Sequence, residues 1–310
     1  MTHTPNLSCI ICTYNRADYL AETLQFLVKN NCTGHVEILI VDNNSTDATR
    51  QTADQYIDKS AKGPVIRYIT EKKQGLSFAR NRGIREAHAP VLLFLDDDIR
   101  VEEDFLESWL SFFKKHPSVL AAGGRIDVQF DDPRPRWLSS YLLPLLGYHN
   151  HGYDIKPYPR KSYPFGGNMG IRKEIFDRFG MFDTELGRIG KKLTASEEKE
   201  FFNRLKEASV PLMYVPNAMI WHRVNQRRLT KEYIRRQAIG LGQSLAIQVQ
   251  SRPFSEQFKT IATESAKWCA SVMLFLYYTV TFRFSKGWML IRFRKWIADG
   301  FYSYQSNQQS

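Results

Sequence analysis

Three consecutive carboxylates, Asp96, Asp97 and Asp98, end an apolar run and form the strongest chemical signal in the sequence. Because side chains alternate between the two faces of an extended strand, Asp96 and Asp98 share one face and Asp97 points away. Paired carboxylate oxygens without a nearby cysteine suit a hard divalent cation, Mn²⁺ or Mg²⁺, that binds a substrate phosphate. The alternative is a solvated acidic turn that leads into the helix expected over residues 101–116, whose N-terminus favours acidic side chains.

Further polar residues follow the first two predicted strands or lie on the helix before the fourth. They offer donors and acceptors for a nucleotide base and ribose, and their arginines offer cations for a phosphate. Taken singly, most of these residues are more typical of helix caps or turns. The set comprises Thr13, Tyr14, Asn15, Arg16, Asp42, Asn43, Asn44, Ser45, Arg80 and Asn81.

Strands and helices alternate through the first half of the chain, which predicts an α/β fold with a doubly wound, mostly parallel sheet and helices on both faces. Ligands bind such sheets at the carboxyl ends of the strands, where these polar residues lie. We expect strands over residues 7–13, 36–42, 65–70, 91–96, 119–128 and 211–215. Helices are expected over 17–29, 46–56, 77–87, 101–116, 173–179 and 196–208, and the proline-rich segment 131–164 is expected to be a functional loop.

Ordered motifs in this frame resemble the family 2 glycosyltransferases with the GT-A fold. The motifs are residues 8–16, 37–47, 75–83, 93–98, 164–172 and 179–183, and the resemblance covers roughly residues 6–240. It implies that a sugar is transferred, with inversion, from a nucleotide-diphosphate sugar to a glycan or lipid-linked acceptor hydroxyl. A UDP-sugar is the favoured donor, and Mn²⁺ or Mg²⁺ is the implied cofactor.

The resemblance also implies roles for individual residues. Asp96 and Asp98 would bind the metal, with Asp98 as the direct ligand, and His222 would approach the metal or the diphosphate. Read alone, a histidine beside a tryptophan is more typical of packing or of a surface. Glycines at 166 and 167 would let the backbone approach the donor sugar, although a plain turn also explains them. The donor-binding set is Thr13, Tyr14, Asn15, Arg16, Asp42, Asn44, Arg80, Asp96, Asp97, Gly167 and Asn168.

Inverting transfer also needs a general base that takes the proton of the attacking hydroxyl. The family places this carboxylate, most often an aspartate, where a helix opens, and residues 196–205 match that position. On a helical wheel, Glu198 falls among the apolar positions that include Phe202, whereas Glu197 lies about a quarter-turn aside. Glu198 is therefore the predicted base, and Glu197 is the alternative.

The positive charge of the chain is concentrated near its end. Residues 221–310 contain 14 Lys and Arg against 4 Asp and Glu, whereas the other residues contain 29 against 28. The uncharged run 268–282 would span about 22 Å as a helix, which is less than the roughly 30 Å of a bilayer core. Cations and aromatic residues follow this run, and that mixture predicts peripheral contact with the inner face of the cell membrane. A docked helix pair and a true span are the alternatives, and no nucleic-acid motif is found.

We therefore expect a GT-A catalytic domain over residues 1–240, with a nucleotide-binding half (1–128) and an acceptor half (129–240). A basic helical extension would follow over 241–310. Apolar residues make up 43% of the chain, which excludes a disordered protein, and four cysteines are too few for a disulfide scaffold. No signal segment is recognised, so a cytoplasmic location is expected.

The sequence is also compatible with two other functions. A nucleotidyltransferase also uses an aspartate-bound metal, but it would be expected to carry a glycine-rich loop after its first strand, where residues 13–16 contain no glycine. A glycosyltransferase-like module without activity could bind a glycan or a membrane. The intact Asp96, Asp98 and Glu198 argue against that module.

Overall fold

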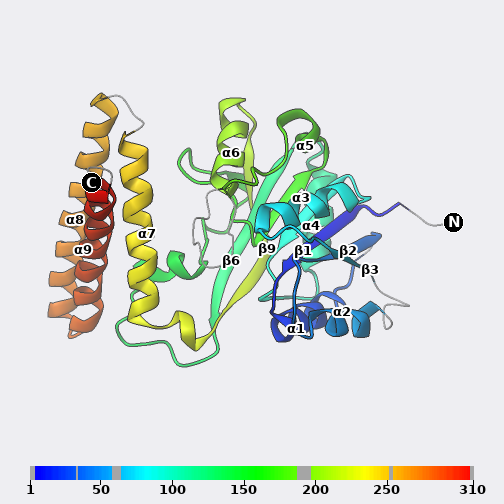
Figure 1. The fold of residues 1–310 in the computed structure, drawn as a ribbon, viewed down its shortest axis with the longest axis horizontal. Coiled ribbons are helices and arrows are strands. Elements are labelled where there is room, and N and C mark those ends of the chain that lie inside the picture. Colours follow the sequence, from blue (N-terminus) through cyan, green and yellow to red (C-terminus); the bar gives the residue numbers. More distant parts are fainter. Residues whose placement is uncertain (1–3, 33, 58–63, 187–196, 251–253, 308–310) are drawn as a thin grey trace. The chain divides into compact units, whose positions relative to one another are not determined.

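The computed structural model describes residues 4–32, 34–57, 64–186, 197–250 and 254–307 (Figure 1). The chain divides into two compact units. The first unit comprises residues 1–127 and 149–223, and the second comprises 128–148 and 224–310. The sequence predicts a domain boundary between residues 240 and 241. In the structure, the whole of helix α7 (Lys231–Gln250) belongs to the second unit, and so do residues 128–148.

A nine-stranded sheet has the order β3-β2-β1-β4-β8-β6-β9-β5, with β7 paired to β9. Strands β1 to β4 are parallel neighbours, as expected, whereas β8 runs antiparallel to both β4 and β6. Strand β8 thus inserts between two strands that point the same way. The strands are β1 (Leu7–Thr13), β2 (Val36–Asp42), β3 (Val65–Thr70), β4 (Val91–Leu95), β5 (Ile99–Val101), β6 (Ala121–Phe130), β7 (Lys156–Pro157), β8 (Asn168–Arg172) and β9 (Leu212–Val224).

Helices cover both faces of this sheet because alternate strand residues enter two separate cores. Cys9 and Ile11 of β1 belong to the core beneath α1, α2 and α4, whereas Ile10 belongs to the core beneath α3, α5 and α6. Burial raises the pKa of the Cys12 thiol to about 12 and that of Cys9 still further, so both remain protonated. The helices are α1 (Ala17–Leu27), α2 (Thr49–Ile57), α3 (Leu76–Glu86), α4 (Phe105–Lys115), α5 (Glu174–Phe179) and α6 (Glu197–Glu207).

The second unit is helical and has its own core. It contains η1 (Ser140–Leu146), η2 (Gln226–Arg228), α7, α8 (Phe254–Val280) and α9 (Phe284–Asn307). Glycines bring α7 and α9 together, because a Cβ added at Gly242 would lie 2.0 Å from the Ile297 carbonyl oxygen. None of the helices within the described residues combines the length and apolar character that crossing a bilayer requires.

Two sequence-based boundaries are wrong, and one segment expected to be a loop contains regular structure. The helix expected over 101–116 begins at Phe105, because residues 99–101 form strand β5. The strand expected over 211–215 continues to Val224 as β9, and its burial pattern alternates on both sides of Pro216. Pro216 lies between the stretch that pairs with β7 and the stretch that pairs with β5, so its missing N–H interrupts neither of these two pairings. The segment 131–164 contains η1 and β7 and is not wholly loop.

Candidate active site

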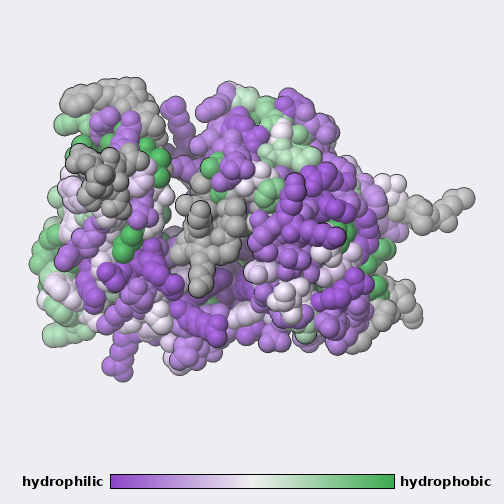
Figure 2. All heavy atoms as spheres, viewed as in Figure 1, coloured by the Kyte–Doolittle hydropathy of each residue, from purple (hydrophilic) through white to green (hydrophobic). Residues whose placement is uncertain are grey.

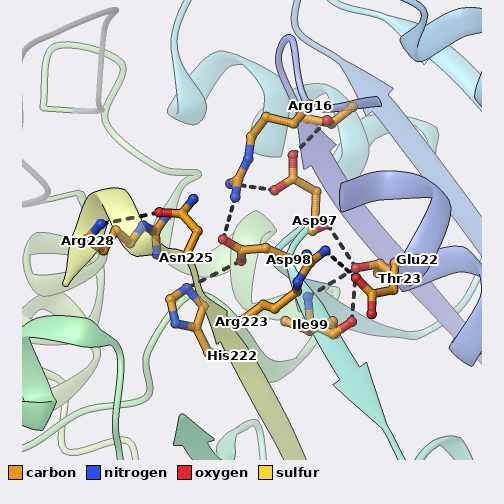
Figure 3. A network of polar contacts seen from close by, with 11 residues as sticks. Arg16, Glu22, Thr23, Asp97, Asp98, Ile99, His222, Arg223, Asn225 and Arg228 are labelled. Atoms are coloured by element: carbon orange, nitrogen blue, oxygen red, sulfur yellow. Dashed lines mark hydrogen bonds and ion pairs between the residues drawn. The ribbon is translucent and has the colours of Figure 1, made fainter. Parts of the chain in front are cut away.

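The three aspartates lie between β4 and β5, and one arginine organises two of them (Figure 3). Arg16, just after β1, places one guanidinium nitrogen 2.7 Å from Oδ1 of Asp97 and the other 2.5 Å from Oδ2 of Asp98. The remaining Asp98 oxygen, Oδ1, faces Nε2 of His222 at 3.4 Å. His222 is opposite Ile99 in the β5–β9 ladder, so the antiparallel pairing of these strands brings the histidine to the aspartates.

This arrangement fits a divalent cation. Three possible ligand atoms lie within 4.8 Å of one another, one each from Asp96, Asp98 and His222. Asp98 and His222 are buried. Two carboxylates and an imidazole form a donor set compatible with Mn²⁺, and the carboxylates also suit Mg²⁺. The structure thus brings together the three residues that the sequence predicts as metal ligands.

Asp97 is not part of this group of ligand atoms, and its contacts support the loop. Its Oδ2 accepts a hydrogen bond of 2.7 Å from the Thr13 hydroxyl, and the Thr23 hydroxyl donates to its backbone carbonyl at 2.9 Å. Burial raises the pKa of Asp97 above its ordinary value, although Arg16 and the Thr13 hydrogen bond act in the opposite direction. Thr13, Arg16 and Asp97 therefore hold the acidic loop in place.

A second charged network joins α3 to α6. The Arg80 guanidinium lies 3.0 Å from Oε1 of Glu197 and 2.8 Å from Oε1 of Glu198. The other Glu198 oxygen accepts a hydrogen bond of 2.9 Å from the backbone N–H of Gly166. The burial order of the two glutamates differs from the expected one, because the Glu197 side chain is fully buried while 19% of the Glu198 side chain is exposed. Arg80 compensates the charge of Glu197 inside the core. A helical wheel of α6 cannot show this contact, because Arg80 lies on another helix.

Two adjacent glycines connect these networks. A Cβ added at Gly166 would lie 1.9 Å from Oε1 of Glu198, and one added at Gly167 would lie 2.6 Å from Oδ2 of Asp96. Side chains at these positions would collide with both carboxylates. The glycine pair therefore allows Glu198 and Asp96 to approach the same short backbone segment.

The polar residues after β1 and β2 form a hydrogen-bonded pair of turns. Asp42 accepts from the Ser45 backbone N–H at 3.0 Å and from the Tyr68 hydroxyl at 2.5 Å. Asn15 accepts from the Thr46 N–H at 2.7 Å, and both Asn15 and Asn44 have positive φ angles, of 52° and 67°. Asparagine tolerates that conformation better than most residues, so the asparagines shape this edge.

Two predicted donor-binding residues have different surroundings. Asn168 is buried and donates to the carbonyl oxygens of Arg125 and Ala218, at 3.1 and 2.7 Å, while its own oxygen accepts from the Trp109 indole. These contacts engage its amide in the sheet. Tyr14, which directly follows β1, is exposed.

Three residues of this region have structural roles. The sequence marks Asn43 and Asn81 only as donors and acceptors for a nucleotide, and it does not mark Tyr68 at all. Asn43 donates to the Lys73 carbonyl at 2.7 Å and accepts from the Gly75 N–H at 2.7 Å, which fixes the start of α3. Asn81 bonds both backbone groups of Phe182, at 2.8 and 3.0 Å. Tyr68 lies two residues before the end of β3, on the face that Asp42 shares, and this spacing is a signal that could have found it.

Known sequences similar to this chain are glycosyltransferases. A model of the family described as Glycosyl transferase family 2 matches residues 8–180. The glucosyl-dolichyl phosphate glucuronosyltransferase of Haloferax volcanii is 22% identical over 232 residues, which are 74% of this chain and 72% of that protein. Seven other curated relatives match over shorter stretches, and the chain spans between 16% and 46% of their length.

Solved structures share the fold. A mannosyltransferase from Pyrobaculum calidifontis, in complex with GDP-Man and Mn²⁺, matches with a TM-score of 0.63 at 15% identity, over 98% of this chain and 88% of that chain. The S. aureus protein TarS, residues 1–349 in complex with UDP, matches with a TM-score of 0.51 at 17% identity, over 98% and 91%. The fold is therefore GT-A, as the sequence motifs imply.

Proposed function

Because the chain belongs to glycosyl transferase family 2, we propose that it transfers a sugar from a nucleotide-diphosphate sugar to an acceptor hydroxyl, with inversion and with a divalent metal as cofactor. Inversion requires that the acceptor attack from the side opposite the leaving diphosphate. The site must therefore hold a cation-binding group and a base on two sides of one sugar position.

One observation carries this proposal. The adjacent glycines 166 and 167 lie against Glu198 and Asp96 respectively, so that a candidate base and a candidate metal ligand flank one backbone segment. A donor sugar that lies along this segment would have the diphosphate on the Asp96 side and the acceptor hydroxyl on the Glu198 side. Glycine is needed at both positions because a Cβ would overlap the carboxylates.

Asp96, Asp98 and His222 would hold the metal, and a divalent cation bound there would stabilise the negative charge of the leaving diphosphate. Arg16 binds Oδ2 of Asp98 and so fixes the orientation of this carboxylate. Thr13 and Arg16 both bind Asp97, and Arg16 also binds Asp98, so contacts within the chain hold the acidic loop before a substrate binds.

Glu198 is the proposed base and Glu197 supports it. Glu198 is partly exposed, so an acceptor hydroxyl can reach its carboxylate, whereas Glu197 is fully buried against Arg80. Arg80 and the Gly166 N–H each hold one Glu198 oxygen, which orients the carboxylate before the acceptor binds. The acceptor proton would pass to Glu198 as the hydroxyl attacks.

The substrates are proposed at the level of chemical class. The TarS structure contains UDP and the mannosyltransferase structure contains GDP-Man, so both nucleotides are candidates and a UDP-sugar remains the first choice. The name of the Haloferax relative specifies a dolichyl phosphate-linked sugar, which supports a lipid-linked or glycan acceptor. A peripheral position at the inner face of the cell membrane would suit such an acceptor.

Release of the nucleotide from a panel of donors tests the proposal: UDP, GDP or dTDP from the corresponding diphosphate sugars, and CMP from a CMP-sugar as the monophosphate comparison. We expect Mn²⁺-dependent turnover of one donor class, and loss of that turnover in Asp98→Asn. Asp177→Asn, an exposed carboxylate on α5, is the matched control and should behave as wild type. An absence of turnover with every donor, despite Mn²⁺-dependent donor binding, would favour the inactive module.

A further inference from the structure

The second unit exposes an uncharged helix face that the catalytic proposal does not use. From Cys269 to the end of α8, the exposed residues include no charged side chain, and Figure 2 shows hydrophobic residues along the outer edge of this helix. The buried side of the helix packs on α9, so this face has no partner among the described residues. The exposed residues are Cys269, Ala270, Val272, Met273, Leu276, Tyr277, Thr279 and Val280.

The turn from α8 to α9 ends in an exposed aromatic residue. The backbone N–H of Arg283 donates to the Tyr278 carbonyl at 2.7 Å, and the N–H of Phe282 donates to the Thr279 carbonyl at 3.1 Å. This is the hydrogen-bond pattern of a Schellman cap, in which the residue at the position of Phe282 is usually glycine. Phe282 has a φ of 54° and is 98% exposed. The chain thus carries a bulky aromatic residue in a conformation that disfavours it, with no packing gain within the protein.

Aromatic rings continue this tip onto α9. Phe284 stacks on Trp288 with ring centroids 6.3 Å apart, and the two side chains are 54% and 49% exposed. Aromatic rings with one apolar and one solvated side are typical of the boundary between lipid headgroups and acyl chains.

The charges around this face select its partner. Residues 265–298 contain six Lys and Arg and no Asp or Glu, and Lys267 and Arg283 flank the uncharged stretch. A second copy of the chain would bring like charges together, whereas an anionic bilayer complements them. Among the described residues, no ion pair involves Arg283 or Lys286.

We propose that the outer face of α8, together with Phe282, Phe284 and Trp288, docks on an anionic lipid bilayer. The aromatic tip enters the headgroup region, and Arg283 and Lys286 bind lipid phosphates. This docking surface goes beyond the catalytic proposal and rests only on the second unit. Each cation held at an anionic surface raises the partition coefficient about fivefold, and burial of a phenylalanine side chain raises it about tenfold or more.

Co-sedimentation of the full chain with lipid vesicles tests this surface. We expect binding to vesicles of phosphatidylcholine mixed with phosphatidylglycerol, and little binding to phosphatidylcholine alone. The double variant Arg283→Gln/Lys286→Gln should bind the mixed vesicles about 25-fold less tightly. Lys114→Gln/Lys115→Gln, which removes two exposed cations from α4, is the matched control and should bind as wild type.

The variant Phe282→Gly should change vesicle binding and thermal stability in opposite directions. Glycine suits the positive φ at this position, so the variant should unfold at a higher temperature than wild type while its vesicle binding falls about tenfold. Tyr302→Ser, which removes an exposed ring near the end of α9, should leave vesicle binding unchanged.

Two results would overturn the proposal: equal binding to both kinds of vesicle, or self-association of the protein that Phe282→Gly abolishes. Donor binding in the first unit should be the same in every one of these variants. A failure of the docking surface is therefore distinguishable from a failure of the catalytic proposal.

Discussion

Replacement of Arg80 by methionine should destabilise the first unit strongly. Arg80 is only 3% exposed and is ion-paired with the fully buried Glu197 and with Glu198. Methionine keeps most of the side-chain volume but leaves a buried carboxylate without its cation. Loss of one partner of a buried ion pair typically costs about 3–5 kcal/mol.

Thermal unfolding measures this loss. For a unit of roughly 200 residues, 1 kcal/mol lowers the midpoint by about 2–4 °C, so Arg80→Met should unfold about 6–20 °C below wild type. Urea unfolding gives the free energy directly and reveals any change in cooperativity.

A double-mutant cycle identifies the cause. Glu197→Gln removes the buried charge that Arg80 compensates, so Arg80→Met/Glu197→Gln should be more stable than Arg80→Met alone, with a coupling energy of about 1–3 kcal/mol. The matched control is Arg82→Met, whose ion pair with Glu86 is partly exposed, at 39% and 33%, and contributes about 1 kcal/mol or less. Strictly additive losses, or an Arg80→Met protein as stable as wild type, would refute the reasoning.

Glu198, Gly167 and His149 each give a further prediction. Glu198→Gln should lower kcat by about 10²–10⁴-fold with little change in donor affinity, while Glu200→Gln on the same helix should keep kcat; equal kcat in both variants would exclude Glu198 as the base. Gly167→Ala should abolish metal-dependent donor binding, because its Cβ would lie 2.6 Å from Asp96, whereas Gly240→Ala, which meets open space, should bind donor normally. Burial and the nearby His151 lower the pKa of His149 to about 3, so this residue stays neutral in the folded protein while the unfolded chain takes up a proton below about pH 6.5. Stability is therefore lost as the pH falls, and between pH 7 and 5 urea unfolding of His149→Gln should show about 2 kcal/mol less of this loss than wild type; an identical loss in both proteins would contradict the assignment.

Much of the first half of the fold follows from local pattern. Strand β1 alternates between two cores, and its parallel neighbours end in the turns that carry Asp42 and Asp96, as the sequence indicates. The acidic cluster was predictable because Asp96 and Asp98 are neighbours in sequence. The likeness of His222 to a family motif identified it as well, although the strand that carries it was predicted to end at residue 215.

The charged contacts between distant segments were not predictable from pattern. Arg80 and Glu197 are 117 positions apart in the sequence, and their contact depends on how α3 and α6 cover the same sheet face. The wheel of α6 placed Glu198 in the apolar arc because it could not include an arginine from another helix. Proline normally ends a strand, so the continuation of β9 beyond Pro216 also required knowledge of its neighbours.

The roles of single residues depended on the same long-range information. Asn168 was predicted to bind donor from its place in a motif, but its amide bonds to backbone groups of two other segments. Residues 187–196, which include the first residue of the expected base-bearing helix, lie outside the described residues. The uncharged run 268–282 was considered as a separate segment, whereas most of it forms the last turns of α8.

Binding of Mn²⁺ in the presence of UDP or GDP, followed by the electron paramagnetic resonance signal of the free ion, tests the central claim most directly. The account predicts that the wild-type protein and Asp177→Asn take up one Mn²⁺ per chain with nucleotide present, and that Asp98→Asn takes up none at the same concentration. Equal uptake by wild type and Asp98→Asn would contradict a metal site built from Asp96, Asp98 and His222.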